Sequence, residues 1–365
     1  MQIKEIISVL EQYAPPALQE TYDNAGLITG NSIWECTGII VSLDATEEIV
    51  QEAIDKKCNL IVAHHPIIFK GLKKITGKNY VEKTIIHAIK NDIAIFAIHT
   101  NLDNVIHGVN GKIADLLGLV NRKILAPKIG LLQKLSVFVP FKEKDKLQNA
   151  LFNAGAGNIG NYSECSFSTE GIGSFKAGIK ANPHLGEIGQ RHLEPEIKLE
   201  VIFPQWLQSK IVDAMQLNHP YEEVAYDIYL LLNNYQHAGS GIIGELPEEV
   251  TEEEMLQKLK SIFKTGLVKH TKLLGNPLKK IALCGGAGSF LTETALAAGA
   301  DMFITADVKY HEFFDAEGKL VLADVGHYES EQFTIELLFD ILREKFPNFA
   351  VLKTGVNTNP VWYYT

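Results

Sequence analysis

The chain has 365 residues, 46% of them hydrophobic, and a formal net charge of −10 at pH 7. A chain of this length and composition can bury a large core, and we expect it to form two or three domains. The acidic balance argues against non-specific binding to nucleic acid, so we expect no nucleic-acid partner.

The first third of the chain alternates amphipathic helical stretches with short apolar strands. This alternation is typical of an α/β domain, whose first part we assign to residues 1–125. Helices are predicted at 3–13, 47–57 and 81–90, and strands at 38–43, 59–63 and 93–98.

The pattern changes over residues 126–242, where a strand, a proline, a helix and a further strand occur twice. Pro140 and Pro204 are 64 residues apart, and Leu147 and Ile211 share that offset. The repeat predicts a duplicated β-α-β unit, and therefore an inserted ferredoxin-like α+β domain. Two unrelated strand-helix units are the alternative interpretation.

The α/β pattern resumes over residues 243–365, after a glycine-rich and then acidic connector. Strands are predicted in KKIALC, DMFITA and KLVLAD, and a helix in ESEQFTIELLFDIL. We therefore expect one discontinuous α/β domain, built from both flanks, with the middle region inserted into it.

The cysteines and the amino terminus both bear on the compartment. The four cysteines form no CxxC pair, which suits buried thiols in a reducing compartment. The amino terminus lacks the continuous apolar stretch of a signal peptide, and no segment approaches the length of a membrane span. We expect a soluble, cytoplasmic protein with no membrane partner. The cysteines are Cys36, Cys58, Cys165 and Cys284.

Histidine and carboxylate side chains follow three of the predicted strands. His64 and His65 end the segment CNLIVAHHP, Asp103 lies in HTNLDN, and His327 and Glu331 follow KLVLADVG. Neighbouring strand residues point to opposite faces, so the two adjacent histidines can converge only where the chain turns. His327 and Glu331 are four residues apart, which a first helical turn would place on one face. Ligands usually bind at strand carboxyl ends in α/β sheets, so we expect these segments to meet.

Together these five side chains predict a site for two divalent metal ions. Neutral imidazoles bind zinc, iron or manganese, and a carboxylate from Asp103 or Glu331 can bridge two ions. Such a pair could hold water as a metal-bound hydroxide at neutral pH. An HH pair or an HxxxE helix start is more often structural when it occurs alone, so the prediction rests on the joint pattern.

Other polar residues near strand ends have less specific signals. His99 is a candidate metal ligand, catalytic proton carrier or supporting partner. His311 is a second candidate for proton transfer, and Lys309 could meet a phosphate, although a solvated loop around Asp307 explains both. Asp23, Asn24 and Asp44 could support the site through hydrogen bonds, or serve in turns and helix caps.

The segment GGAGS, with Gly285, Gly286 and Gly288, follows another predicted strand. Backbone N–H groups at a helix start can cradle an anion or phosphate. The segment lacks the lysine of a Walker loop, and a tight strand-to-helix turn is the more ordinary interpretation.

Seven motifs in this order resemble the NGG-interacting-factor-three-like family, also named GTP cyclohydrolase type 2 homologs. The resemblance covers both flanks. The central HPYEEVAYDIY is similar to the insert of longer bacterial members, whose fold is like that of the PII and CutA proteins. The seven motifs are YDNAGLITG, SLDAT, AHHPIIF, HTNLDN, GGAGS, TADVKYH and DVGHYESE.

The resemblance implies a dinuclear centre held by His64, His65, Asp103, His327 and Glu331, and assembly as a homohexamer. It also implies a metal-dependent hydrolase that acts on a nucleotide such as GTP, opening the imidazole ring of the purine. A regulatory or scaffold protein that senses a small molecule or partner through its PII-like insert is the main alternative. A metal chaperone or store is another.

Overall fold

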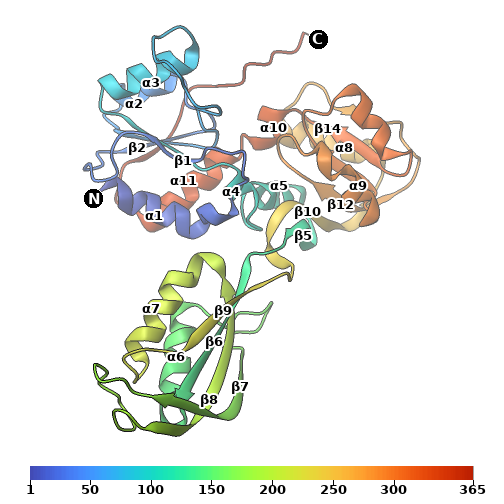
Figure 1. Cartoon of the computed structure of the whole chain (residues 1–365). Coiled ribbons are helices and arrows are strands. Elements are labelled where there is room, and N and C mark those ends of the chain that lie inside the picture. The colour runs from blue at the N-terminus through green and yellow to red at the C-terminus, as the bar shows by residue number, and fades with distance from the viewer. Residues whose placement is uncertain (365) are drawn as a thin grey trace. The chain divides into compact units, whose positions relative to one another are not determined.

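The computed structural model describes residues 1–364, which form two compact units (Figure 1). Unit 1 combines residues 1–127 with the residues from 237 onward, and unit 2 comprises residues 128–236. The two flanks of the sequence thus fold together as unit 1, while the middle region folds as a unit of its own.

Unit 1 contains a five-stranded sheet in the order β1-β4-β3-β2-β15. Strands β15, β2, β3 and β4 are parallel, and β1 pairs with β4 in the antiparallel direction. Every residue of β2, β3 and β4 is buried, as expected for parallel strands covered on both faces. The strands are β1 (Gly26–Thr29), β2 (Ile39–Ser42), β3 (Leu60–Ala63), β4 (Ala94–Ala97) and β15 (Val351–Lys353).

Helices cover both faces of this sheet. Alternate residues of β2 divide between two cores, with Val41 packed in one and Ile40 in the other. Thr46 and Asn79 cap the starts of α2 and α3 by accepting hydrogen bonds from backbone N–H groups. The helices are α1 (Ile3–Tyr13) and α11 (Thr334–Lys345) on the first core, and α2 (Glu47–Asp55) and α3 (Tyr80–Lys90) on the second.

A six-stranded sheet of order β11-β14-β13-β12-β10-β5 forms the rest of unit 1. Strands β12, β13 and β14 are parallel, and β10 and β11 are antiparallel to their neighbours β12 and β14. The strands are β5 (Val120–Lys128), β10 (Tyr235–Val250), β11 (Lys269–His270), β12 (Leu278–Leu283), β13 (Met302–Thr305) and β14 (Val321–Asp324).

One hydrophobic core joins the two sheets of unit 1. It contains Val62 of β3, Ile281 of β12 and Leu338 of α11, which come from both flanks of the chain. The same core includes residues of α5 and α8. The remaining helices of unit 1 are α4 (Thr100–Asp103), α5 (Val109–Leu117), α8 (Glu252–Phe263), α9 (Thr292–Ala297) and α10 (His327–Glu331).

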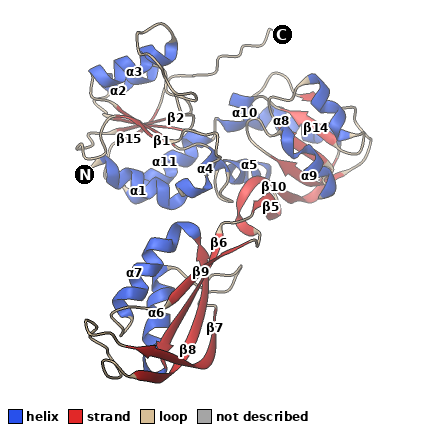
Figure 2. Ribbon diagram, viewed as in Figure 1, coloured by secondary structure: helices blue, strands red, loops and turns tan. Residues whose placement is uncertain are grey.

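Unit 2 is an antiparallel sheet of order β7-β8-β6-β9 with both helices on one face (Figure 2). Pro140 and Pro204 each end a strand, and each is followed by a 3-10 turn and an 11-residue helix. Leu147 and Ile211 are both fully buried in its core. The elements are β6 (Leu132–Pro140), α6 (Lys144–Ala154), β7 (Ser166–Lys176), β8 (Arg191–Pro204), α7 (Gln208–Asn218) and β9 (Tyr226–Leu231).

Within the described residues, no helix combines the length and apolar character that crossing a membrane requires. The cysteines are free, as the sequence suggested: Cys36, Cys58 and Cys284 are buried, whereas Cys165 is half-buried. Helix α2 ends two residues earlier than predicted. Lys57 has φ of 58°, a left-handed conformation that cannot continue the helix.

Candidate metal centre

The predicted ligands come together at the carboxyl ends of parallel strands in unit 1. His64 and His65 directly follow β3, Asp103 ends α4 after β4, and His327 and Glu331 bound α10 after β14. The chain bends at the two adjacent histidines, and their ring centroids are 4.9 Å apart. This bend lets neighbouring residues converge where a continuing strand would separate them.

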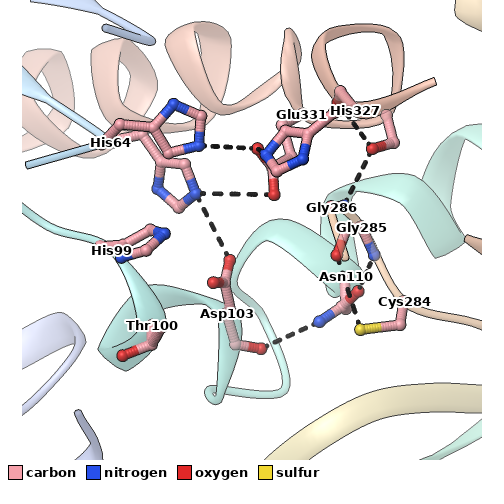
Figure 3. A network of polar contacts seen from close by, with 12 residues as sticks. His64, His99, Thr100, Asp103, Asn110, Cys284, Gly285, Gly286, His327 and Glu331 are labelled. Atoms are coloured by element: carbon pink, nitrogen blue, oxygen red, sulfur yellow. Dashed lines mark hydrogen bonds and ion pairs between the residues drawn. The ribbon is translucent and has the colours of Figure 1, made fainter. Parts of the chain in front are cut away.

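Glu331 lies at the middle of the group (Figure 3). Its Oε2 atom is 2.9 Å from His65 Nε2 and 3.0 Å from His327 Nε2. Its Oε1 atom is 4.0 Å from His64 Nε2, which lies 3.6 Å from Asp103 Oδ1. The sequence therefore predicted five side chains that the structure brings into one cluster.

His99 is a sixth member of this cluster. Its ring centroid lies 5.2 Å from that of His64 and 5.4 Å from that of His65. The three imidazoles offer ring nitrogens within 4.8 Å of one another. His99 is thus placed where a further ligand or a proton carrier would act.

All four imidazoles use Nδ1 for a hydrogen bond outside the cluster, which leaves Nε2 as the ring nitrogen available inside it. Such partners fix the tautomer and orientation of histidine ligands in metalloproteins. The Nδ1 pairs are His64 with the Ile98 carbonyl (2.8 Å), His65 with Asp44 (2.8 Å), His99 with Asp23 (2.8 Å) and His327 with Asp307 (2.7 Å).

Hydrogen bonds within the protein do not satisfy every ligand atom of the cluster, and a metal ion would. Among the described residues, His64 Nε2 is a buried nitrogen that lacks a hydrogen-bond partner. A buried polar atom without a partner is costly, and a bound cation would satisfy it. Three overlapping groups could hold an ion: His64, His65 and His99; His65, His327 and Glu331; and His64, Asp103 and Glu331.

Neighbouring carboxylates favour the charged forms of two imidazoles in the cluster. Burial opposes the charged form of His65, but hydrogen bonds to Asp44 and Glu331 outweigh it and raise its pKa to about 10. Burial likewise opposes protonation of His327, while Asp307 and Glu331 raise its pKa to about 11. Glu331 is also buried, and these two imidazolium groups hold its pKa well below the usual range.

At the other side of the cluster, the surroundings of His64 and Asp103 favour their neutral forms. Complete burial lowers the pKa of His64 to about 3, so this imidazole is neutral and ready to bind a metal. Burial, followed by the neighbouring Glu331 charge, raises the pKa of Asp103 well above its usual range. A cation between Asp103 and Glu331 would relieve the repulsion between the two carboxylates.

The GGAGS segment supports this cluster. Gly286 has φ of 61°, and a Cβ atom there would lie 2.2 Å from Glu331 Oε1. The N–H groups of Gly285, Gly286 and Gly288 donate to Asn110, Ser330 and Thr305 side chains. These three donors are therefore committed inside the protein, which favours the tight strand-to-helix turn over a phosphate cradle.

Two of the less specific candidates lie away from the cluster. His311 is exposed, and its ring contacts in the described part of the chain are with Tyr310 and Phe314. Lys309 is exposed and pairs with Glu312 in its own turn. The structure therefore does not bring His311 or Lys309 among the clustered imidazoles. Their exposed positions agree with the alternative interpretation, a solvated loop.

Several supporting residues had weak or no sequence signals. Asp44 was offered as a supporting or capping residue, and it accepts from both His65 Nδ1 and Thr358 Oγ1. Asp307, in the solvated-loop segment, orients His327. The role of Thr358, 314 residues after Asp44, had no sequence signal because only the fold brings it there.

A pocket of about 460 Å³ opens beside the cluster. His65 and His327 form part of its wall, and Tyr328 and Tyr363 add aromatic surface. Lys269 also lines it and pairs with Asp324. The pocket thus gives a small molecule access to the two imidazoles.

Comparisons with known proteins agree along almost the whole chain. Residues 1–360 match the family described as Duf34/NIF3 (NGG1p interacting factor 3). A Bacillus subtilis protein named "GTP cyclohydrolase 1 type 2 homolog" is 39% identical over 362 residues, covering 98% of this chain and 97% of that protein.

Solved structures give the same result. A Bacillus cereus protein related to NIF3 aligns with a TM-score of 0.87 at 37% identity, covering 100% of this chain and 99% of that one. A Staphylococcus aureus protein aligns with a TM-score of 0.79 at 30% identity, with the same coverage. The resemblance found in the sequence motifs is confirmed, and this α/β chain belongs to the Duf34/NIF3 family.

Proposed function

We propose that the protein is a metal-dependent hydrolase that acts on a purine nucleotide such as GTP. The observation that carries the proposal is the inward set of imidazole Nε2 atoms around Glu331, with His64 Nε2 buried and unpartnered in the described chain. Bound divalent ions would activate water and polarise the substrate for hydrolytic opening of the purine imidazole ring.

Glu331 supports a count of two ions. Its Oε2 atom lies beside His65 and His327, whereas its Oε1 atom faces His64. The two carboxylate oxygens therefore belong to two different groups of potential ligands, and Glu331 would serve both. Zinc, iron and manganese all suit imidazole and carboxylate ligands.

The other residues orient the ligands and handle protons. Asp44 and Asp307 hold the rings of His65 and His327 through Nδ1. Hydrogen bonds from His99 and Thr100 overcome burial and lower the pKa of Asp23 to about 2, so its charge fixes the His99 ring. The remaining ring nitrogen of His99 would exchange a proton with the substrate or water.

A nucleotide substrate is supported by the neighbouring pocket and by the names of relatives. Tyr328 and Tyr363 supply aromatic surface next to His65 and His327, which suits a flat purine ring. The Bacillus subtilis relative is named as a GTP cyclohydrolase homolog. GTP is therefore the first nucleotide to test.

The proposal also covers the fold of the inserted domain, the oligomeric state and the compartment. The element order β6-α6-β7-β8-α7-β9 and its sheet order support a ferredoxin-like, PII/CutA-like inserted domain. The resemblance to the family implies a homohexamer, and the free cysteines fit a reducing compartment such as the cytoplasm. Analytical ultracentrifugation of the full chain would test the hexamer.

The test combines metal content with turnover. We expect elemental mass spectrometry to find about two divalent ions per chain, and chromatography to detect ring-opened product from GTP. His64→Ala and Glu331→Ala should lose metal and turnover together, whereas His87→Ala, at a half-buried position in the last turn of α3, should keep both.

Two outcomes would contradict the hydrolase. A chain that stays metal-free after incubation with zinc, iron and manganese would exclude the mechanism. A chain that binds metal tightly without turning over any purine nucleotide would favour the regulatory or scaffold alternative, and readily exchangeable metal would favour a metal store.

A further inference from the structure

Unit 2 contains a cavity of about 810 Å³ that shares no residue with the metal centre. Strand β7 forms one wall, the loop 177–185 a second, and the segment that starts at Tyr221 a third. That last segment belongs to the motif HPYEEVAYDIY, whose role the metal centre does not explain. A cavity of this volume can hold a small organic ligand.

Aromatic rings gather around Tyr221. Its ring centroid lies 6.1 Å from that of Phe175, 6.2 Å from that of His184 and 5.1 Å from that of His219. Phe175, His184 and Tyr221 all line the cavity, together with Phe138 from β6. The cavity is therefore lined by several aromatic rings, and aromatic rings attract cations and flat apolar groups.

A carboxylate is fixed beside these rings. Tyr221 donates its hydroxyl hydrogen to Glu196 Oε1 over 2.9 Å, so the aromatic ring and the carboxylate hold each other. A Cβ atom at Gly173 would lie 1.9 Å from Glu196 Oε2. Strand β7 thus carries a glycine where the Glu196 side chain crosses it, and any other residue would displace the carboxylate.

Negative charge predominates in the lining. Glu170, Glu196, Glu222 and Glu223 line the cavity, against Lys176 and Lys198. Lys198 is already paired, because its Nζ atom donates to Glu200 Oε1 over 2.9 Å. This balance disfavours phosphates and other anions and favours a cationic ligand.

We propose that unit 2 binds a small organic cation, an amine carried on an aromatic or apolar body. The amine would pair with Glu196, and its body would pack against Tyr221 and Phe175. This site is separate from the metal centre in unit 1, and the proposal stands whether or not the protein hydrolyses a nucleotide.

Isothermal titration of the full chain with three compounds that share one ring system tests the charge requirement. Tryptamine is the cation, tryptophol the neutral analogue and indole-3-propionate the anion. We expect tryptamine to bind and the other two to bind at least about tenfold more weakly. Glu196→Gln should weaken tryptamine binding about tenfold or more, because it removes the charge but keeps an acceptor for Tyr221.

Two variants serve as controls. Glu143→Gln, in the turn after β6, removes one negative charge of unit 2 outside the cavity and should leave tryptamine binding unchanged. His64→Ala should also leave it unchanged, which separates this site from the metal centre. The proposal is overturned by absence of tryptamine binding, by equal binding of all three compounds, or by full affinity in the folded Glu196→Gln variant.

Discussion

His65 Nε2 lies 2.9 Å from Glu331 Oε2, although 266 residues separate the two in the chain. The contact joins the segment after β3 to the helix after β14, and unit 2 lies between them in the sequence. A centre built this way exists only when both flanks have folded together. Unit 2 therefore separates the ligand-bearing segments along the chain, and the fold of unit 1 brings them together.

Metal binding should release protons. His65 and His327, with pKa values raised to about 10 and about 11, are protonated at neutral pH in the metal-free chain. Imidazole must be neutral to bind a metal, so each ion that enters displaces protons from these rings. Because both pKa values are raised, metal affinity should increase as pH rises through neutrality, by up to about 100-fold per pH unit for two protons.

Calorimetric titration with zinc at pH 7, in buffers that differ in ionisation enthalpy, measures this release. We expect about two protons per chain in the wild type. Zinc binding without any buffer dependence of the enthalpy would show that both imidazoles are already neutral in the free protein.

Asp307→Asn should weaken metal binding without unfolding the protein. Asp307 accepts the Nδ1 hydrogen bond of His327, and a carboxylate in that position makes the imidazole a stronger ligand. Losing the charge should reduce zinc affinity about 10- to 100-fold, measured by competition with a chromophoric chelator. Asp315→Asn, in the 3-10 turn Tyr310–Ala316 that follows Asp307, is the matched control and should bind zinc like the wild type. Equal zinc affinities in the two variants would show that Asp307 does not support metal binding.

Sequence periodicity was sufficient for elements whose burial decides their structure. The continuous apolar runs of β2, β3 and β4 and the helix at 3–13 appear where they were predicted, because their side chains pack in two cores. The short strands β1 and β15 were not predicted. Both lie at the sheet edges and are mostly half-buried or exposed, so they lack the continuous buried run that identifies β2, β3 and β4, and their pairing partners decide their structure.

Only some residues of the candidate site could likewise be predicted from the sequence. Residues with a distinctive type and spacing, such as His64 next to His65, could be chosen from the sequence. Asp307 and Thr358 could not be assigned their partners, because an aspartate in a loop or a threonine in a tail has many ordinary roles. His311 was chosen for its residue type, and the fold leaves it on the surface beside Tyr310.

Gly286→Ala should damage the metal centre beyond its effect on the backbone. Gly286 has φ of 61°, and the added Cβ atom would meet Glu331 Oε1. Gly275 has a similar φ of 75° but open space around its Cβ position, so Gly275→Ala measures the conformational cost alone. That cost is about 1–2 kcal/mol.

We expect Gly286→Ala to lower the free energy of unfolding more than Gly275→Ala does, and to reduce the bound metal per chain. Urea unfolding and elemental mass spectrometry measure the two effects. If both alanine variants keep a full metal content, the close approach of Gly286 to Glu331 has no part in metal binding.

Thr358→Val should reveal how far the support of the centre extends. Thr358 donates its hydroxyl hydrogen to Asp44 Oδ2, while Asp44 Oδ1 accepts from His65 Nδ1. Valine keeps the shape but removes the donor, so Asp44 loses one of the hydrogen bonds that stabilise its charge. We expect the free energy of unfolding to fall by about 1 kcal/mol and zinc affinity to fall by less than about tenfold, since Thr358 acts on the ligand through Asp44. Thr358→Ser keeps the hydroxyl and should restore zinc affinity. If serine and valine lower that affinity equally, the methyl packing of the tail, and not its hydrogen bond to Asp44, supports the centre.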